Sequence, residues 1–308
     1  MKKIYLLSTD HLEDGLWFRD DEDFRVAMNY VAIQAASSPE VAVLAFILMS
    51  NHVHFVLKGR REDVLGFINQ FKQRYSQYFK RKYGTPGFLR RNPLDIQIIP
   101  NEDEAVERVI AYVQMNCVAA NICAHPTQYP WGTGDAFFSH SKTNGKRVEE
   151  YSGRALERLL HSFCDKLPGH WLINEDGFIT PKSYVDVHSV ELLFQSARRM
   201  NYFQNNSSKA KKRIETAKNN CPAIRDQAIL AVLPDLYRSL FQKTSFDELN
   251  EKEQSELARQ IRFRFSADVT QIARVCGISY AEAANLLDSS SPIYSVRLWS
   301  MQAGYSSG

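Results

Sequence analysis

Two histidines stand one residue apart in the segment SNHVHFVL, residues 50–57. Side chains of an extended strand alternate between its two faces, so His52 and His54 project from the same face. Two neighbouring imidazoles can give two nitrogen ligands to one divalent metal ion, with another residue, the substrate and water completing the coordination. The same pattern occurs where two strand histidines are simply half buried. Taken alone, the pair is compatible with a metal site and with a structural role.

A tyrosine and an asparagine stand four residues apart in the segment AYVQMN. A helix turns through about 100° per residue, so Tyr112 and Asn116 lie about 40° apart and share a face. Tyr112 lies about 110° from the centre of the apolar stripe expected for this helix, at the edge of its buried face. A cleft residue occupies such a position, and so does an ordinary amphipathic tyrosine at a core boundary. The stripe consists of Val106, Val109, Ile110, Val113, Cys117 and Ala120.

Basic residues gather between Lys58 and Arg91, where ten Lys or Arg stand against two acidic residues, a local net charge of +8 (10 minus 2). Such a balance suggests a polyanionic partner. Within this stretch, interleaved lysines, arginines and aromatic residues suit phosphate contacts beside base stacking. The same pattern fits a solvated basic face over a packed aromatic stripe, with Phe71, Tyr75 and Phe79 in the core. The candidate DNA-binding residues are Lys72, Arg74, Lys80, Arg81, Lys82, Arg90 and Arg91.

The elements that must position these residues follow an α+β order. Apolar alternation predicts strands over residues 3–8, 41–49, 52–57 and 94–99. Helical spacing predicts helices over residues 21–36, 62–83 and 101–120, the last opened by a capping pair of Asn101 and Glu104. This order indicates a ferredoxin-like antiparallel sheet with helices.

The polar stretch at residues 141–153 lacks apolar periodicity and is expected to be a linker. It separates a first domain, residues 1–140, from a second domain, residues 154–308, whose pattern is mainly helical. The overall order therefore predicts an α+β domain followed by a helical domain.

Residues 268–288 resemble a helix-turn-helix, with Ala273 four residues before Gly277 and an apolar helix after it. A small residue there allows close packing of two helices, and the glycine makes the turn. The second helix carries Glu282 and Asp288 and is followed by no Lys or Arg before residue 297. The sequence is compatible both with a packing role and with DNA recognition for this pair of helices.

The bulk sequence narrows the classes of protein further. The longest apolar run has nine residues, fewer than the roughly 20 that span a bilayer, and the N-terminus lacks a signal-peptide pattern. We therefore expect a cytoplasmic protein with no membrane partner. No GxxxxGK phosphate loop is present, so no nucleotide cofactor is expected. Five cysteines at irregular spacings indicate reduced packing residues.

Four segments resemble, in the same order, the REP-associated tyrosine transposases, an IS200-like (Y1) group of the HUH endonucleases. They lie within residues 1–140 and read SNHVHFVL, INQFKQRYSQYFKRKYG, YVQMN and YPWGTG. The chain departs from this family at Ser50 and Cys117, where proline is common. The segment FLRRNPL also fits the family's LFxxRF pattern poorly. Neither single replacement removes a reactive group.

The resemblance implies that His52, His54 and Asn116 hold a divalent metal ion, Mg²⁺ or Mn²⁺, and that Tyr112 is the nucleophile. A phenol with a pKa of about 10 is a poor nucleophile and needs a polarised target or a nearby base. A metal on the scissile phosphate would offset the charge that grows there. Tyr112 would become linked to the 5′ phosphate, and a second hydroxyl could rejoin the strand without ATP. The implied partner is single-stranded DNA that carries a REP-like hairpin.

Three functions remain to be separated. The first, which we expect, is a single-strand nicking and joining enzyme with a phosphotyrosine intermediate. The second is a catalytically quiet regulator of the same fold that binds DNA hairpins. The third is an unrelated metal hydrolase that uses the histidine pair, for which the sequence offers no convincing set of carboxylates. A monomer and a homodimer are both compatible with the sequence.

Overall fold

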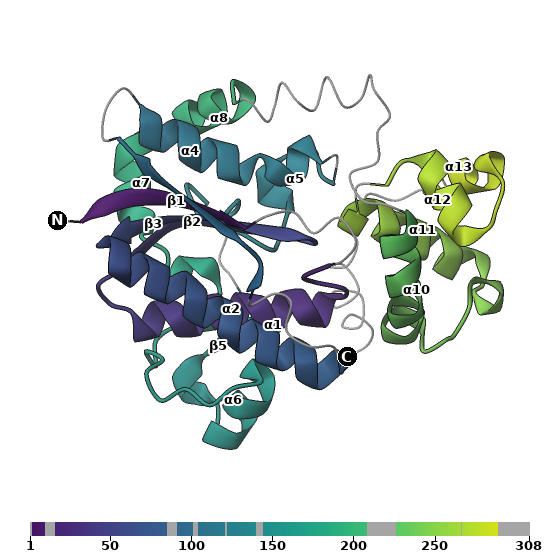
Figure 1. Ribbon diagram of the computed structural model, residues 1–308, viewed down its shortest axis with the longest axis horizontal. Coiled ribbons are helices and arrows are strands. Elements are labelled where there is room, and N and C mark those ends of the chain that lie inside the picture. The colour runs from purple at the N-terminus through teal and green to yellow at the C-terminus, as the bar shows by residue number, and fades with distance from the viewer. Residues whose placement is uncertain are drawn as a thin grey trace, which may run out of the picture. The chain divides into compact units, whose positions relative to one another are not determined.

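The computed structural model in Figure 1 describes residues 2–9, 16–84, 91–100, 104–120, 122–139, 144–207, 226–265 and 267–288. The chain divides into two compact units, Met1–Asn219 and Asn220–Gly308. Among the described residues, no helix is long and apolar enough to cross a membrane.

A four-stranded antiparallel sheet lies at the centre of the first unit. Its strands are β1 (Lys3–Thr9), β2 (Ala42–Met49), β3 (His52–Gly59) and β4 (Leu94–Ile99), in the order β2-β3-β1-β4. The helix α1 (Asp21–Ser37) joins β1 to β2, and α2 (Arg61–Tyr83) joins β3 to β4. This order of elements is that of a ferredoxin-like fold. The predicted α+β class is confirmed.

Helices cover both faces of this sheet (Figure 1). On one face, the ring of Phe55 from β3 contacts Phe67 and Phe71 of α2, with centroid distances of 6.0 and 5.5 Å. On the other face lie α4 (Ala105–Gln114) and α5 (Asn116–Ala119), where His54 meets Tyr112. The alternation of side chains along β3 therefore places the aromatic core on one face of the sheet and the candidate site residues on the other.

The helix predicted over residues 101–120 is divided at Met115, between α4 and α5. The side-chain amide of Asn116 donates to the carbonyl oxygens of Tyr112 and Val113, at 3.0 and 3.1 Å. These carbonyls are the acceptors of the next helical turn, so the side chain competes with the backbone for them. Glu104 precedes α4 in the left-handed conformation, and the predicted cap Asn101 lies outside the described residues.

The first unit continues past residue 140, the predicted end of the first domain. The helix α6 (Gly153–Leu160) packs against α1, α7 (Val187–Phe194) against β2, and α8 (Ala197–Asn205) against α4. A small sheet pairs β5 (Gly145–Arg147) with β6 (Leu172–Asn174), and Val148 beside it is buried. The structure thus places the division of the chain later than the polar stretch at 141–153, because these helices bury apolar side chains against the first unit.

Two segments cover the outer edge of β2. The backbone N–H of Leu48 donates to the carbonyl of Trp131 at 2.9 Å, and that of Thr133 donates to Phe46 at 3.0 Å. A Cβ on Gly132 would lie 2.8 Å from the Phe46 oxygen, so only glycine fits this close approach. Residues 185–186 cover the other half of the strand. The YPWGTG segment therefore protects a sheet edge.

Four helices make up the described part of the second unit: α10 (Asp226–Phe241), α11 (Glu251–Phe265), α12 (Val269–Cys276) and α13 (Tyr280–Asp288). Gly277 has φ +69° after α12, and the N–H of Ile278 donates to the Ala273 carbonyl at 3.0 Å. The helical pattern of this region is confirmed, and α12 and α13 form the expected pair around a glycine turn. Short 3₁₀ helices lie at residues 126–128, 148–150, 181–183 and 246–248.

Candidate active site

His52 and His54 lie side by side on β3, as their spacing predicted. Their ring centroids are 4.8 Å apart, and the ring planes meet at 83°. Both side chains are buried, with exposed fractions of 5% and 4%. His54 stands opposite Ser8 of β1 and Ile47 of β2, so it is held inside the sheet rather than at its edge.

Hydrogen bonds to the Nδ1 atoms orient both rings. Nδ1 of His52 lies 2.8 Å from the amide oxygen of Asn51, and Nδ1 of His54 lies 2.7 Å from the hydroxyl of Ser8. An amide oxygen can only accept, so Nδ1 of His52 donates and its neutral ring carries the lone pair on Nε2. Such an oriented imidazole is the form that binds a metal ion.

Tyr112 projects from α4 toward His54, with 5.9 Å between ring centroids and 75° between ring planes. It is half-buried, while Ile110 and Val113 beside it are buried. The predicted place at the edge of the buried face is thus confirmed. Desolvation raises the pKa of Tyr112 above its ordinary value. The phenol therefore stays protonated at neutral pH and needs a polarised target to act as a nucleophile.

Asn116 begins α5 and is buried next to Tyr112. Both of its hydrogen bonds described above use the amide nitrogen, so its oxygen is the atom that could bind a metal ion. In the part of the chain that the structure describes, no three His, Cys, Asp or Glu residues could hold a metal. The chemistry of two imidazoles and an amide oxygen is compatible with a divalent metal ion, and the ligand set implied by the resemblance stays a prediction.

The aromatic residues of α2 form its packing face. Phe71, Tyr75 and Phe79 are fully buried, as expected from the sequence. Lys72, in contrast to our expectation, is also buried, and its ammonium group donates to the backbone carbonyl of Asn92. It therefore presents no charge for a DNA phosphate in this structure.

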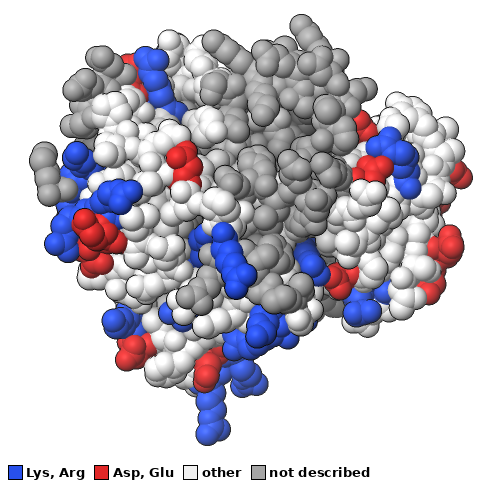
Figure 2. All heavy atoms as spheres, viewed as in Figure 1, with Lys and Arg blue, Asp and Glu red and all other residues white. Residues whose placement is uncertain are grey.

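The other candidate DNA-binding residues differ in exposure. Lys80, Arg81 and Arg91 are exposed. Arg74 is half-buried and donates to the hydroxyl of Ser162 at 2.8 Å. Arg90 lies outside the described residues. Figure 2 shows basic side chains gathered in the lower part of this view, over the region of α2 and α6 in Figure 1.

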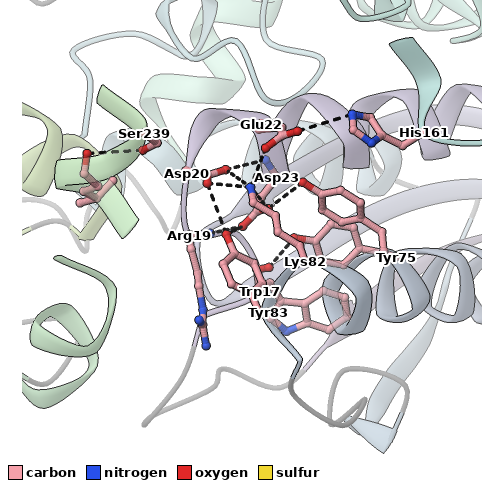
Figure 3. Close-up of polar contacts among 12 residues, drawn as sticks. Trp17, Arg19, Asp20, Glu22, Asp23, Tyr75, Lys82, Tyr83, His161 and Ser239 are labelled. Carbon is pink, nitrogen blue, oxygen red and sulfur yellow. Dashed lines mark hydrogen bonds and ion pairs between the residues drawn. The ribbon is translucent and has the colours of Figure 1, made fainter. Parts of the chain in front are cut away.

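Lys82, like Lys72, was expected to contact DNA but has protein partners instead. An acidic cluster surrounds its ammonium group (Figure 3). Its nitrogen lies 2.7 Å from Asp20, 2.9 Å from Glu22 and 2.9 Å from Asp23. The hydroxyl of Tyr83 donates to Asp23 at 2.8 Å. Lys82 thus ties the end of α2 to the start of α1. Sequence reasoning missed the cluster because a count of charges does not show which of them are paired.

Burial raises the pKa of Asp23 to about 6, and the neighbouring carboxylate of Asp20 adds to the rise while Lys82 opposes it. Asp23 also accepts the backbone N–H of Arg19 at 2.8 Å. The cluster therefore fixes residues 19–23, the entry to α1, against the last turn of α2.

The end of α2 lies at the end of the sheet where β3 begins. Trp17 makes the connection, because its backbone N–H donates to the carbonyl of Ser50 at 2.7 Å and its backbone carbonyl accepts the hydroxyl of Tyr75 at 2.6 Å. Ser50 precedes His52 by two residues. The exposed residues Lys80 and Arg81 thus belong to the same end of the sheet as the histidine pair.

Residues 18–88 match the family model described as Transposase IS200 like. This segment therefore matches a family of enzymes that act on DNA. The family of this domain is that of the IS200-like transposases, as the resemblance predicted. The match includes both histidines and α2 and ends before Tyr112. No curated protein and no solved structure matches the chain.

Proposed function

We propose that the first unit nicks and joins single-stranded DNA, with Tyr112 as the nucleophile. The observation that carries this proposal is the contact between Tyr112 and His54, with His52 beside it. It places a phenol next to two oriented imidazoles in a chain that carries an IS200-like transposase domain.

In the proposed reaction the Tyr112 oxygen attacks the scissile phosphorus in line with the leaving 3′ oxygen. The phenol loses its proton as the new ester forms, and the departing oxygen takes up a proton to become a free 3′ hydroxyl. Tyr112 then holds the 5′ phosphate. Because the phosphotyrosine ester keeps the energy of the broken bond, a 3′ hydroxyl can attack it and restore a DNA strand without ATP.

The protein side of this chemistry is orientation. Asn51 and Ser8 hold the two imidazoles, and the Asn116 side chain is held against α4. When bound by His52, His54 and the Asn116 oxygen, Mg²⁺ or Mn²⁺ supplies positive charge at a phosphate oxygen, and Mn²⁺ suits imidazole better. The half-buried position of Tyr112 lets its hydroxyl meet a strand from solvent.

The proposed substrate is a single strand with a short hairpin. Lys80, Arg81 and Arg91 are exposed and suited to the phosphates of the stem. An unpaired strand can bend around a helix-borne tyrosine, whereas a duplex resists this approach. Binding by these three side chains requires no particular base sequence.

The test presents one labelled sequence in three forms: a single strand with a hairpin, a plain single strand and a perfect duplex. We expect cutting of the hairpin strand with a protein–DNA adduct at Tyr112 and a free 3′ hydroxyl. Tyr112→Phe should abolish the adduct and keep hairpin binding, whereas Tyr202→Phe, at an exposed tyrosine of α8, should cut normally.

Other outcomes point to the other two functions. Hairpin binding without cutting by the wild-type protein would indicate the regulator. Equal cutting of the duplex, or a free 5′ phosphate with no protein attached, would indicate a hydrolase. Either result would refute the proposed mechanism.

A further inference from the structure

A buried chain of side-chain amides connects α8 to α4. The amide nitrogen of Gln204 donates to the amide oxygen of Gln114 at 2.7 Å, and the amide nitrogen of Gln114 donates to the carbonyl of Thr133 at 3.3 Å. The three residues are 3%, 2% and 1% exposed. Water is thus excluded from these hydrogen bonds, and a lost partner would leave a buried polar group unsatisfied.

The chain continues from Thr133 into the central sheet. The hydroxyl of Thr133 accepts the N–H of Phe46 on β2 at 3.2 Å, and its own N–H donates to the Phe46 carbonyl. Phe46 stands opposite Phe55 of β3, which directly follows His54. The hydrogen bonds therefore run from α8 through α4 to the strands that hold the histidine pair.

Gln114 is the last residue of α4 and stands two positions after Tyr112. Residues two positions apart in a helix are separated by about 200° around its axis, so the side chains of Tyr112 and Gln114 leave the helix on nearly opposite sides. The hydrogen bonds of Gln114 hold one side of α4. They consequently fix the rotation of α4 about its axis, and with it the direction in which Tyr112 points toward His54. The two amide hydrogen bonds of Gln114 also set the height of the helix above the sheet.

A second contact holds the opposite end of α4. Arg199 of α8 donates to Glu104 at 2.9 Å and to Glu107 at 3.4 Å, both at the start of α4. The helix α8 is therefore hydrogen-bonded to both the first and the last turn of α4. Its residues lie outside the region that matches the transposase model and outside residues 1–140.

We propose that Gln204 and Gln114 are positioning residues, which set the attack geometry of Tyr112 through one hydrogen bond between α8 and α4. The proposal rests on the proposed function for its kinetic consequence. Small displacements of a nucleophile lower the rate of a step strongly while substrate binding is kept.

The kinetic test uses the full chain with Gln204→Leu, Gln114→Leu and the double variant. Each single change should lower kcat for hairpin cleavage by about tenfold or more, with KM and the Mn²⁺ affinity changed by less than about twofold. The double variant should be no slower than the slower single variant, because both remove the same bond. Gln70→Leu, the same change at an exposed position of α2, is the matched control and should cut normally.

A spectroscopic measurement follows the position of Tyr112 without any cutting. With 3-fluorotyrosine at position 112, the fluorine resonance should shift or broaden in Gln204→Leu and stay in place in Gln70→Leu, because the ring sits against His54. This readout keeps the inference testable even if the wild-type protein cuts no DNA, a result that would refute only the proposed function.

Gln204→Met, which keeps the length of the side chain and removes its donor, is the second variant if Gln204→Leu does not fold. An unchanged fluorine resonance together with wild-type kcat in these variants would overturn the positioning role. Failure of both Gln204 variants to fold would overturn it as well, since the bond would then serve the stability of the unit as a whole.

Discussion

The phenol ring of Tyr112 stands edge-on to the imidazole of His54, with 5.9 Å between their centroids. These residues come from opposite sides of the interface between α4 and the sheet. Their contact depends on the alternation of β3, which turns His54 toward α4 and Phe55 toward α2. A shift of β3 by one residue would exchange these faces and remove the site.

The histidine pair gives the first prediction. His52→Ala or His54→Ala should abolish Mn²⁺ binding and metal-dependent cleavage, because an amide and one imidazole leave too few protein ligands. Manganese binding followed by electron paramagnetic resonance, together with the hairpin assay, measures both effects. The exposed His170→Ala is the control. Unchanged binding in either site variant would move the metal site elsewhere.

The hydrogen bond between Asn51 and His52 gives the second prediction. Asn51→Ala keeps both imidazoles and removes the acceptor that orients one of them. We expect Mn²⁺ affinity to fall about 10- to 100-fold, as for other partners of ligating histidines. Cleavage should return at high Mn²⁺ concentration, which it cannot do in His52→Ala. A variant that stays inactive in saturating Mn²⁺ would contradict an orienting role.

The third prediction separates exposed from buried basic residues. Lys80→Gln, Arg81→Gln and Arg91→Gln should each make the salt dependence of hairpin binding shallower, by a slope of about 0.7 to 0.9 per lost phosphate contact. Lys72→Gln should leave this slope unchanged, since the side chain is buried against Asn92. Binding isotherms at several salt concentrations give the slopes. An equal effect of Lys72→Gln would show that the protein rearranges on binding.

The edge of β2 gives the fourth prediction. Gly132→Ala brings a Cβ to 2.8 Å from the Phe46 oxygen, so the backbone must shift. We expect a loss of about 1–3 kcal/mol in the free energy of unfolding, the usual cost of forcing extra atoms into a packed site. Urea unfolding followed by tryptophan fluorescence tests this, with Gly66→Ala, which meets open space, as the control. Equal stability of both variants would contradict the tight fit.

Much of the site follows from local sequence rules. Period-two alternation placed His52 and His54 on one face, and helical spacing placed Tyr112 at the edge of a buried stripe. Those rules use only neighbours in the sequence. These rules could not predict that the helix is interrupted before Asn116. The interruption depends on hydrogen bonds from the Asn116 side chain to the carbonyls of Tyr112 and Val113.

The burial of charged side chains and the extent of the first unit could not be predicted from the sequence, for a related reason. Lys72 and Lys82 look like members of one basic face, yet each finds its partner far along the chain, at Asn92 and Asp20. Likewise, the helix α8 belongs to the first unit through Gln204 and its contact with α4, not through any local pattern. Only the tertiary arrangement supplies these partners.

The acidic cluster at the start of α1 gives the last prediction. The pKa of Asp23 is raised from 3.8 to about 6, so between these values the folded protein holds a proton that the unfolded chain has released. The stabilising contribution of this proton is therefore fully present below about pH 4 and is lost as the pH rises through 6. The cluster also contains the titratable groups of Lys82, Asp20, Glu22, Tyr78 and Tyr83, and Glu22 lies 3.5 Å from the imidazole of His161.

Asp23→Asn removes this titration and keeps one of the two oxygen acceptors, which can still serve the Arg19 N–H and the hydroxyl of Tyr83. The free energy of unfolding of the variant, relative to wild type, should increase from pH 4 to 6 and then level off. Tryptophan fluorescence in urea reports on the first unit, since three of the four tryptophans, Trp17, Trp131 and Trp171, are buried there. Glu175→Gln, at an exposed carboxyl group, is the control. A constant difference across this pH range would mean that Asp23 is ionised throughout and that Lys82 outweighs its burial.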